Sequence, residues 1–187
     1  MCCVPRQRSA AIAMALPLIK APPALAAPDF FVTADGPIRA ADAVAAILVL
    51  EDGRYIMQLR DTLPNIFYPA HWGCFGGAVN DGEKPLDALV REVEEELEYR
   101  VERAAEFTRF EFDLSHLGQP KVFRTFFEVR VPDEAFRGFV LHEGAAFEAI
   151  PGRELLAHRK VTPYDAFAVW MHVSRRRFEA AGKETPA

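Results

Sequence analysis

The chain has 187 residues, of which 50% are hydrophobic and 26% are charged, a composition typical of a soluble globular protein with a single core. Its formal net charge of -5 argues against nucleic acid or an anionic membrane as the main partner, because both favour a basic surface. Three cysteines cannot form a disulfide framework, so a reducing, cytoplasmic location is the default expectation.

Residues 1–39 are predicted to be an extension that precedes the folded domain at 40–187. One interpretation is a flexible arm rich in alanine and proline. The other is a weak secretory signal, which would mean export, because a basic start, a short apolar run and a stretch of alanines follow one another. Pro17 and Lys20 interrupt that run, which is also too short to span a bilayer.

The domain is predicted to begin with a β-hairpin. An apolar run at Val44–Leu50 is followed by the turn residues Glu51, Asp52 and Gly53, and a second strand is expected at Tyr55–Arg60. The segment from Thr62 to Gly77 reads as a loop, in which Cys74 is expected to be a small buried hydrophobe.

A second hairpin and a C-terminal helix follow the acidic segment described below. Polar and apolar residues alternate from Thr108 to Leu114 and again in Lys121–Val131, with turn residues between them. A short strand, a helical turn at 152–157 and a helix from Pro163 to about Ala181 complete the chain. Interspersed helices and strands indicate an α/β or α+β layered domain.

A glutamate-rich helix is predicted to start at Pro85. At 100° per residue, its apolar side chains form one stripe that must face a core. This stripe comprises Leu86, Leu89, Val90, Val93 and Leu97.

Three carboxylates share one side of this helix, beside the apolar stripe. Measured from Glu92, Glu95 and Glu96 lie at about 300° and about 40°. Like charges at this spacing repel, and a hard divalent cation such as Mg²⁺ would remove the penalty. The alternative is a solvated acidic face on which Arg91 pairs with Glu95 and Glu96 with Arg100.

Gly76 and Gly77 favour the site interpretation. They precede a tight loop and then the acidic helix, an arrangement in which backbone and metal can approach a phosphate chain closely. Glu83 and Arg91 stand eight residues apart across the loop-to-helix junction, where they could pair and hold the two segments in register.

The segment Gly77–Tyr99 resembles the Nudix box. It contains a glycine, five residues, Glu83, seven residues, Arg91-Glu92-Val93, one residue, and Glu95-Glu96. One departure is Glu98, which stands where the family pattern has glycine and which predicts either a longer helix or a different exit from it.

The resemblance implies a Nudix-like α/β (α+β) fold, with a mixed central sheet sandwiched between helices. It also implies a pyrophosphohydrolase that uses Mg²⁺, or Mn²⁺ in its place, to cleave a nucleoside diphosphate linked to another moiety. The metal ligands would be Glu92, Glu95 and Glu96. Catalysis would involve Glu95, Glu92, Arg91 and the downstream Glu143, and substrate binding would involve Gly76, Gly77, Arg60 and Arg124.

The main alternative to catalysis is a Nudix-like module that binds a nucleotide as a sensor, because Glu98 interrupts the box. In either case the expected partner is a small nucleotide derivative, with neither nucleic acid nor membrane involved, and a homodimer is compatible with the sequence. Glu143 could equally be an exposed residue before the turn at Gly144.

Overall fold

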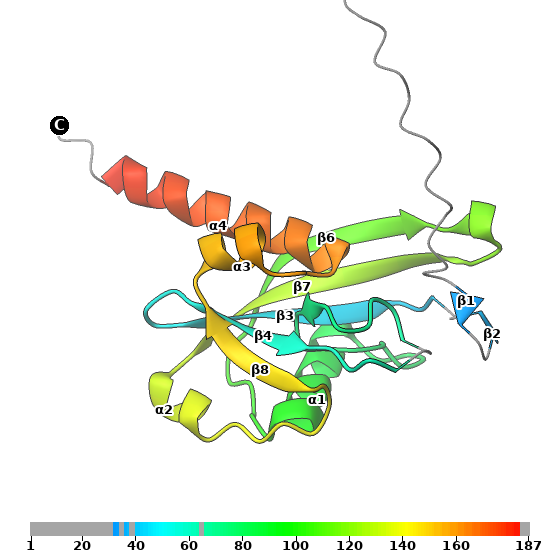
Figure 1. Ribbon diagram of the computed structural model, residues 1–187, viewed down its shortest axis with the longest axis horizontal. Coiled ribbons are helices and arrows are strands. Elements are labelled where there is room, and N and C mark those ends of the chain that lie inside the picture. Colours follow the sequence, from blue (N-terminus) through cyan, green and yellow to red (C-terminus); the bar gives the residue numbers. More distant parts are fainter. Residues whose placement is uncertain (1–31, 34–35, 38–39, 64–65, 184–187) are drawn as a thin grey trace, which may run out of the picture.

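Figure 1 shows the computed structural model, which describes residues 32–33, 36–37, 40–63 and 66–183. Most of the predicted extension, residues 1–39, therefore lies outside the described residues, and its interpretation stays a prediction. Within it, two short strands pair antiparallel: β1 (Val32–Thr33) and β2 (Gly36–Pro37). The remaining elements in chain order are β3 (Ala43–Leu50), β4 (Tyr55–Leu59), β5 (Trp72–Gly73), α1 (Pro85–Leu97), β6 (Ala105–Asp113), a 3₁₀ helix (Ser115–Leu117), β7 (Lys121–Val131), α2 (Asp133–Arg137), β8 (Ala146–Ile150), α3 (Gly152–His158) and α4 (Pro163–Lys183).

The central sheet is mixed, as predicted. Its strand order is β5-β4-β3-β7-β6, with β8 paired to β4. The two expected hairpins, β3 with β4 and β6 with β7, are both antiparallel, whereas β3 and β7 pair in parallel along their whole shared length, from Ala43 opposite Arg124 to Leu50 opposite Val131. Every residue of β3 after Ala43 is buried, as expected for a central strand covered on both faces.

Helices cover the two faces of the sheet (Figure 1). Alternate residues of β3 enter two separate cores. One core contains Val44, Ala46 and Leu48 together with the apolar face of α1. The other contains Ala45 and Ile47 together with residues of α3 and α4. The predicted arrangement of a sheet sandwiched between helices is confirmed.

Helix α1 begins at Pro85, as predicted, but its buried face differs from the predicted stripe. Leu86 is 44% exposed, Val90 is only partly buried, and Ala88 is completely buried instead. A helical wheel gives the direction of a side chain but not how far the neighbouring layer extends along the helix axis, and Leu86 lies in the first turn. The short helix α2 was not predicted.

The end of α1 resolves the question raised by Glu98. The helix is not prolonged: Glu98 takes the left-handed conformation, with φ 53°, and its N–H donates to the carbonyl of Glu94. The backbone at Glu98 therefore ends the helix in the left-handed conformation that glycine usually adopts at this position. The Glu98 side chain accepts a hydrogen bond of 2.7 Å from Nε2 of the His142 ring.

No helix in the described ranges combines the length and apolar character that crossing a bilayer requires.

We expect Glu98→Gly to be more stable than Glu98→Ala by about 1 kcal/mol, because only glycine adopts this backbone conformation without steric cost. Both variants lose the contact with His142, so their difference isolates the backbone. At the exposed helix position Glu94 the order should reverse, with the glycine variant less stable than the alanine variant by about 0.5–1 kcal/mol. Urea unfolding of the four variants measures both differences. Equal stability of the two Glu98 variants would contradict the assignment.

Candidate active site

The three glutamates predicted as metal ligands lie at different depths on α1. Glu96 is only 5% exposed, whereas the Glu92 and Glu95 side chains are 16% and 62% exposed. Solvent exposure therefore increases in the order Glu96, Glu92, Glu95. The alternative of a solvated acidic face is therefore wrong for Glu96, which is buried and does not pair with Arg100 in the described contacts.

Arg91 binds the other acidic side chains around it. Its guanidinium contacts Glu83 at 2.9 Å, Glu92 at 2.6 Å and Glu95 at 3.3 Å. It also donates to the carbonyl of Ala78 at 3.0 Å, and the pairing of Glu83 with Arg91 across the loop is confirmed. The bond from Arg91, helped by the Asn80 N–H, lowers the pKa of Glu83 to about 2. One arginine thus joins the loop to the helix and orients two predicted metal ligands.

Gly76 and Gly77 allow the carboxylates to touch the backbone. The Gly76 N–H donates to Glu96 Oε2 at 2.9 Å, from a residue with φ 125°. A Cβ on Gly76 would collide with the carbonyl oxygen of Val44, and one on Gly77 would collide with the Glu92 carboxylate. A side chain at Gly76 would therefore push this segment away from β3, whereas one at Gly77 would displace the Glu92 side chain of α1.

Glu96 is held in an environment that disfavours its charge. Burial raises its pKa to about 8; the Gly76 N–H opposes this effect, while the nearby charges of Glu143 and Glu92 add to it and Arg60 reduces it. Four predicted site residues, Glu92, Glu96, Glu143 and Arg60, are thus close enough to affect one another electrostatically.

Glu143 is brought to α1 by the loop that follows α2. The N–H groups of Val140 and His142 donate to the carbonyls of Leu97 and Glu96, which are among the free acceptors at the end of the helix. Gln58 then donates to the Glu143 carbonyl at 2.9 Å. The Glu143 side chain stays exposed and borders the cavity described next.

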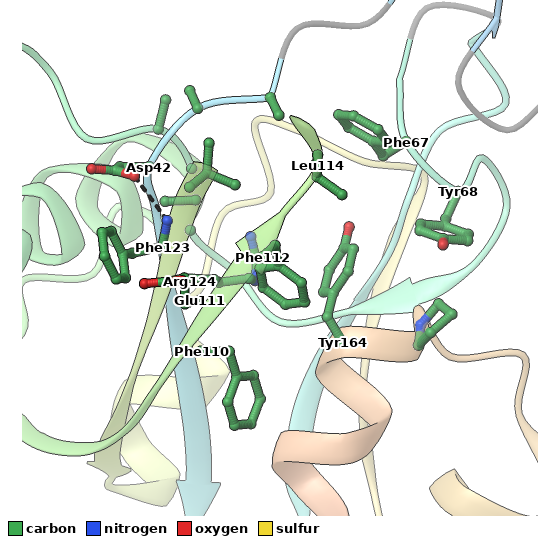
Figure 2. A pocket seen from close by; sticks show the side chains of 18 of the residues that line it. Asp42, Phe67, Tyr68, Phe110, Glu111, Phe112, Leu114, Phe123, Arg124 and Tyr164 are labelled. Atoms are coloured by element: carbon green, nitrogen blue, oxygen red, sulfur yellow. Dashed lines mark hydrogen bonds between the residues drawn. The ribbon is translucent and has the colours of Figure 1, made fainter. Parts of the chain in front are cut away.

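A cavity of about 840 Å³ opens beside the glycines. Figure 2 shows aromatic side chains reaching it from β6, β7, the start of α4 and the loop before β5. Its polar lining includes the three arginines Arg60, Arg109 and Arg124. Its aromatic lining consists of Phe67, Tyr68, Phe110, Phe112, Phe123, Tyr164 and Phe167.

The two arginines predicted to bind phosphate both line this cavity, but they have different partners. Arg60 donates Nε–H to the Phe67 carbonyl at 2.9 Å, and its charge partly opposes the rise in the pKa of Glu96 and of Tyr164, so it is near both residues. Arg124 is paired with the buried Asp165 at 3.2 Å. Its charge is therefore already balanced within the protein.

Several lining residues were not predicted from the sequence. The alternation that revealed β6 and β7 also marked Phe110, Phe112 and Phe123, but it gave no sign that they share a cavity. Asp165 was recognisable only as part of the start of α4. Its contacts with β7 and with Cys74 involve residues far away in sequence, which no local pattern encodes. Cys74 and Phe75 are buried as expected.

The acidic side chains suit a hard divalent cation by their chemistry. Carboxylate oxygens are the ligands that Mg²⁺ and Mn²⁺ prefer, and a cation would stabilise the charged form of Glu96, whose pKa is raised mainly by burial and further by the charges of Glu143 and Glu92. Within the described ranges, no three potential ligands already converge on one point. Glu92 and Glu95 would have to turn from Arg91 to share an ion with Glu96.

Comparisons with known proteins agree with this geometry. A family model described as the NUDIX domain matches residues 39–173. Among solved structures, a MutT protein from Methanosarcina mazei Go1 aligns with a TM-score of 0.59 at 19% identity, covering 79% of this chain and 98% of that one. The Escherichia coli dihydroneopterin triphosphate pyrophosphohydrolase aligns with a TM-score of 0.55 at 22% identity, covering 74% and 98%. Such identities establish the fold alone. No curated protein matches the sequence.

Glu96→Gln should make stability in EDTA less dependent on pH. The folded protein keeps a proton on Glu96 up to about pH 8, whereas the unfolded chain releases it near 4.5. The folded state therefore binds more protons in this window, and Glu96 contributes stability that is lost as the pH rises through the folded pKa.

Thermal unfolding from about pH 5 to about pH 9 tests this expectation. The wild type should lose more stability with rising pH than Glu96→Gln does. Glu94→Gln, an exposed change on the same helix, is the control and should follow the wild type. The same pH profile in all three proteins would show that Glu96 does not titrate as described.

Proposed function

Because the chain belongs to the Nudix family, we propose that it is a pyrophosphohydrolase that cleaves the diphosphate linkage of a nucleoside diphosphate linked to another moiety. The observation that carries the proposal is the contact of the α1 carboxylates with the backbone of Gly76 and Gly77, next to a cavity large enough for a nucleotide portion.

The residues that would hold a divalent cation, Mg²⁺ or alternatively Mn²⁺, are Glu92, Glu95 and Glu96. The bound ion would supply Lewis-acid stabilisation of the diphosphate charge and lower the pKa of a bound water. Arg91 pairs with Glu92 and Glu95, which would turn from it toward the ion. Glu96 is fixed from the opposite side by the Gly76 N–H.

Substrate phosphates would lie between the glycines and the cavity. The backbone of Gly76 and Gly77 permits close approach there, since neither residue carries a side chain. Arg60 adds a positive charge near Glu96, and Arg124 adds a guanidinium to the cavity lining, with its charge paired to Asp165. These groups and the cation explain how a chain with net negative charge can bind a polyanion.

Glu143 is the candidate general base. It is exposed, borders the cavity and lies near enough to Glu96 to raise the pKa of that residue. A carboxylate in this position can accept the proton of an attacking water. Glu95, the most exposed of the three predicted ligands, is a second candidate for contact with the reacting water.

The alternative, a non-catalytic sensor, depended on Glu98 disturbing the end of α1. Since Glu98 adopts the conformation expected of glycine, the positions of Glu95 and Glu96 are not displaced by it. This geometry favours catalysis over sensing.

The test is product release from nucleoside triphosphates, nucleotide sugars, ADP-ribose and NADH, with Mg²⁺, with Mn²⁺ and with EDTA. A coupled phosphatase registers both monophosphate and pyrophosphate products. Metal-dependent release supports the proposal. Nucleotide binding by a folded protein without any release would support the sensor instead.

Glu95→Gln should lower kcat by at least roughly 100-fold and leave the melting temperature within a few degrees of the wild type. The change removes one carboxylate charge at nearly constant shape, and the exposed ion pair with Arg91 adds little to stability. Glu94→Gln, one residue away on the solvent side, is the matched control and should keep full activity. Full activity of Glu95→Gln would refute its role as a ligand.

A further inference from the structure

Asp165 joins three separate segments beneath the cavity. It lies in the first turn of α4 and is 1% exposed. Its carboxylate accepts bonds from the Cys74 N–H at 2.9 Å, the Thr162 hydroxyl at 2.7 Å and Arg124 Nε at 3.2 Å. A buried carboxylate with this many donors has few alternative positions, so it fixes the elements that supply them.

Through Arg124, this carboxylate also sets the position of Tyr164. The Arg124 guanidinium lies over the Tyr164 ring, 4.6 Å from its centroid, and the edge of the Tyr68 ring contacts Tyr164 with centroids 5.6 Å apart. Burial acts to lower the pKa of Arg124, but the charge and hydrogen bond of Asp165, together with Tyr164 and Cys74, outweigh it and the pKa is raised. Arg124 thus remains a cation and supports one wall of the cavity.

Aromatic rings form a large part of the cavity lining. Figure 2 shows Phe112 entering it from β6 and Tyr164 from the start of α4. Two of the lining carboxylates are already engaged: Asp42 accepts the Phe123 N–H at 2.8 Å, and Glu111 lies 3.7 Å from the Lys121 ammonium. The third, Glu143, is exposed and is the candidate general base. A sugar needs several polar partners, whereas a flat aromatic ring needs faces on which to stack.

We propose that the cavity receives the flat ring of the substrate against Tyr164 and Phe112, and that Asp165 is the positioning residue that holds this wall through Arg124. The proposal rests on the proposed function and deepens it. The protein would then recognise the nucleobase half of the substrate and would not select the group on the other side of the cleaved linkage. Arg124 then acts mainly as a support for Tyr164.

The kinetic test compares a nucleoside triphosphate with ribose 5-triphosphate, which carries the same phosphates and sugar but no nucleobase. We expect the wild type to show a KM roughly 10-fold or more lower for the nucleotide, the gain typical of base stacking. Tyr164→Phe should keep this preference. Tyr164→Ala should lose most of it, by raising KM for the nucleotide far more than for ribose 5-triphosphate.

Asp165→Asn should show the same selective rise in KM with a smaller change in kcat, which a general loss of stability would not produce. Trp170→Ala is the control, because Trp170 is an exposed aromatic on the same helix that is not among the cavity-lining residues. It should keep the wild-type preference. If Asp165→Asn does not fold, the Tyr164 pair still decides the assignment.

A binding measurement separates failure of this inference from failure of the proposed function. Calorimetric titration with a panel of nucleoside monophosphates in EDTA requires no turnover. Binding to the wild type that weakens about 10-fold in Tyr164→Ala supports the ring site even if no substrate is cleaved. Turnover without ring preference, equal preference in Tyr164→Ala, or no binding of any nucleoside monophosphate would each overturn it.

Discussion

The structure around the site depends on the hydrogen bond from the Gly76 N–H to the buried Glu96 carboxylate. A carboxylate withdrawn from water is costly unless it is bonded or paired, and here the backbone supplies the bond. That bond brings α1 against the Gly76 and Gly77 segment, where the Glu92 carboxylate occupies the space that a side chain at Gly77 would need. The position of α1, the glycine pair and the raised pKa of Glu96 therefore all depend on the same close contact between α1 and the glycine segment.

The sheet separates two tasks. On one face, α1 carries Arg91 and the carboxylates that would bind the cation and, through it, the phosphates. On the other face, the start of α4 meets aromatic residues of β6 and builds a surface suited to a flat ring. The end of the sheet near Ala43 connects both, and Arg60 lies between them. Chemistry and recognition can therefore be altered separately, because they depend on side chains of different layers.

The sequence predicted those features that local spacing encodes. The hairpins, the start of α1 at Pro85, the start of α4 at Pro163 and the pairing of Glu83 with Arg91 all follow from patterns within a few residues. The burial of each carboxylate could not be predicted from this spacing. Adjacent carboxylates on one side of the helix range from buried Glu96 to exposed Glu95, because their burial is set by the Gly76 segment and the loop before β8. The role of Asp165 depends on partners distant in the sequence.

The parallel pairing of β3 with β7 also constrains how the chain folds. Ala43 finds its partner at Arg124, so the central strand of the sheet cannot complete its ladder until most of the chain is available, and a long loop must be closed at an entropic cost. The hairpin of β3 with β4 is local and can form first. Before β7 pairs with it, β3, whose eight residues are all apolar, has an unpaired edge at which chains can associate.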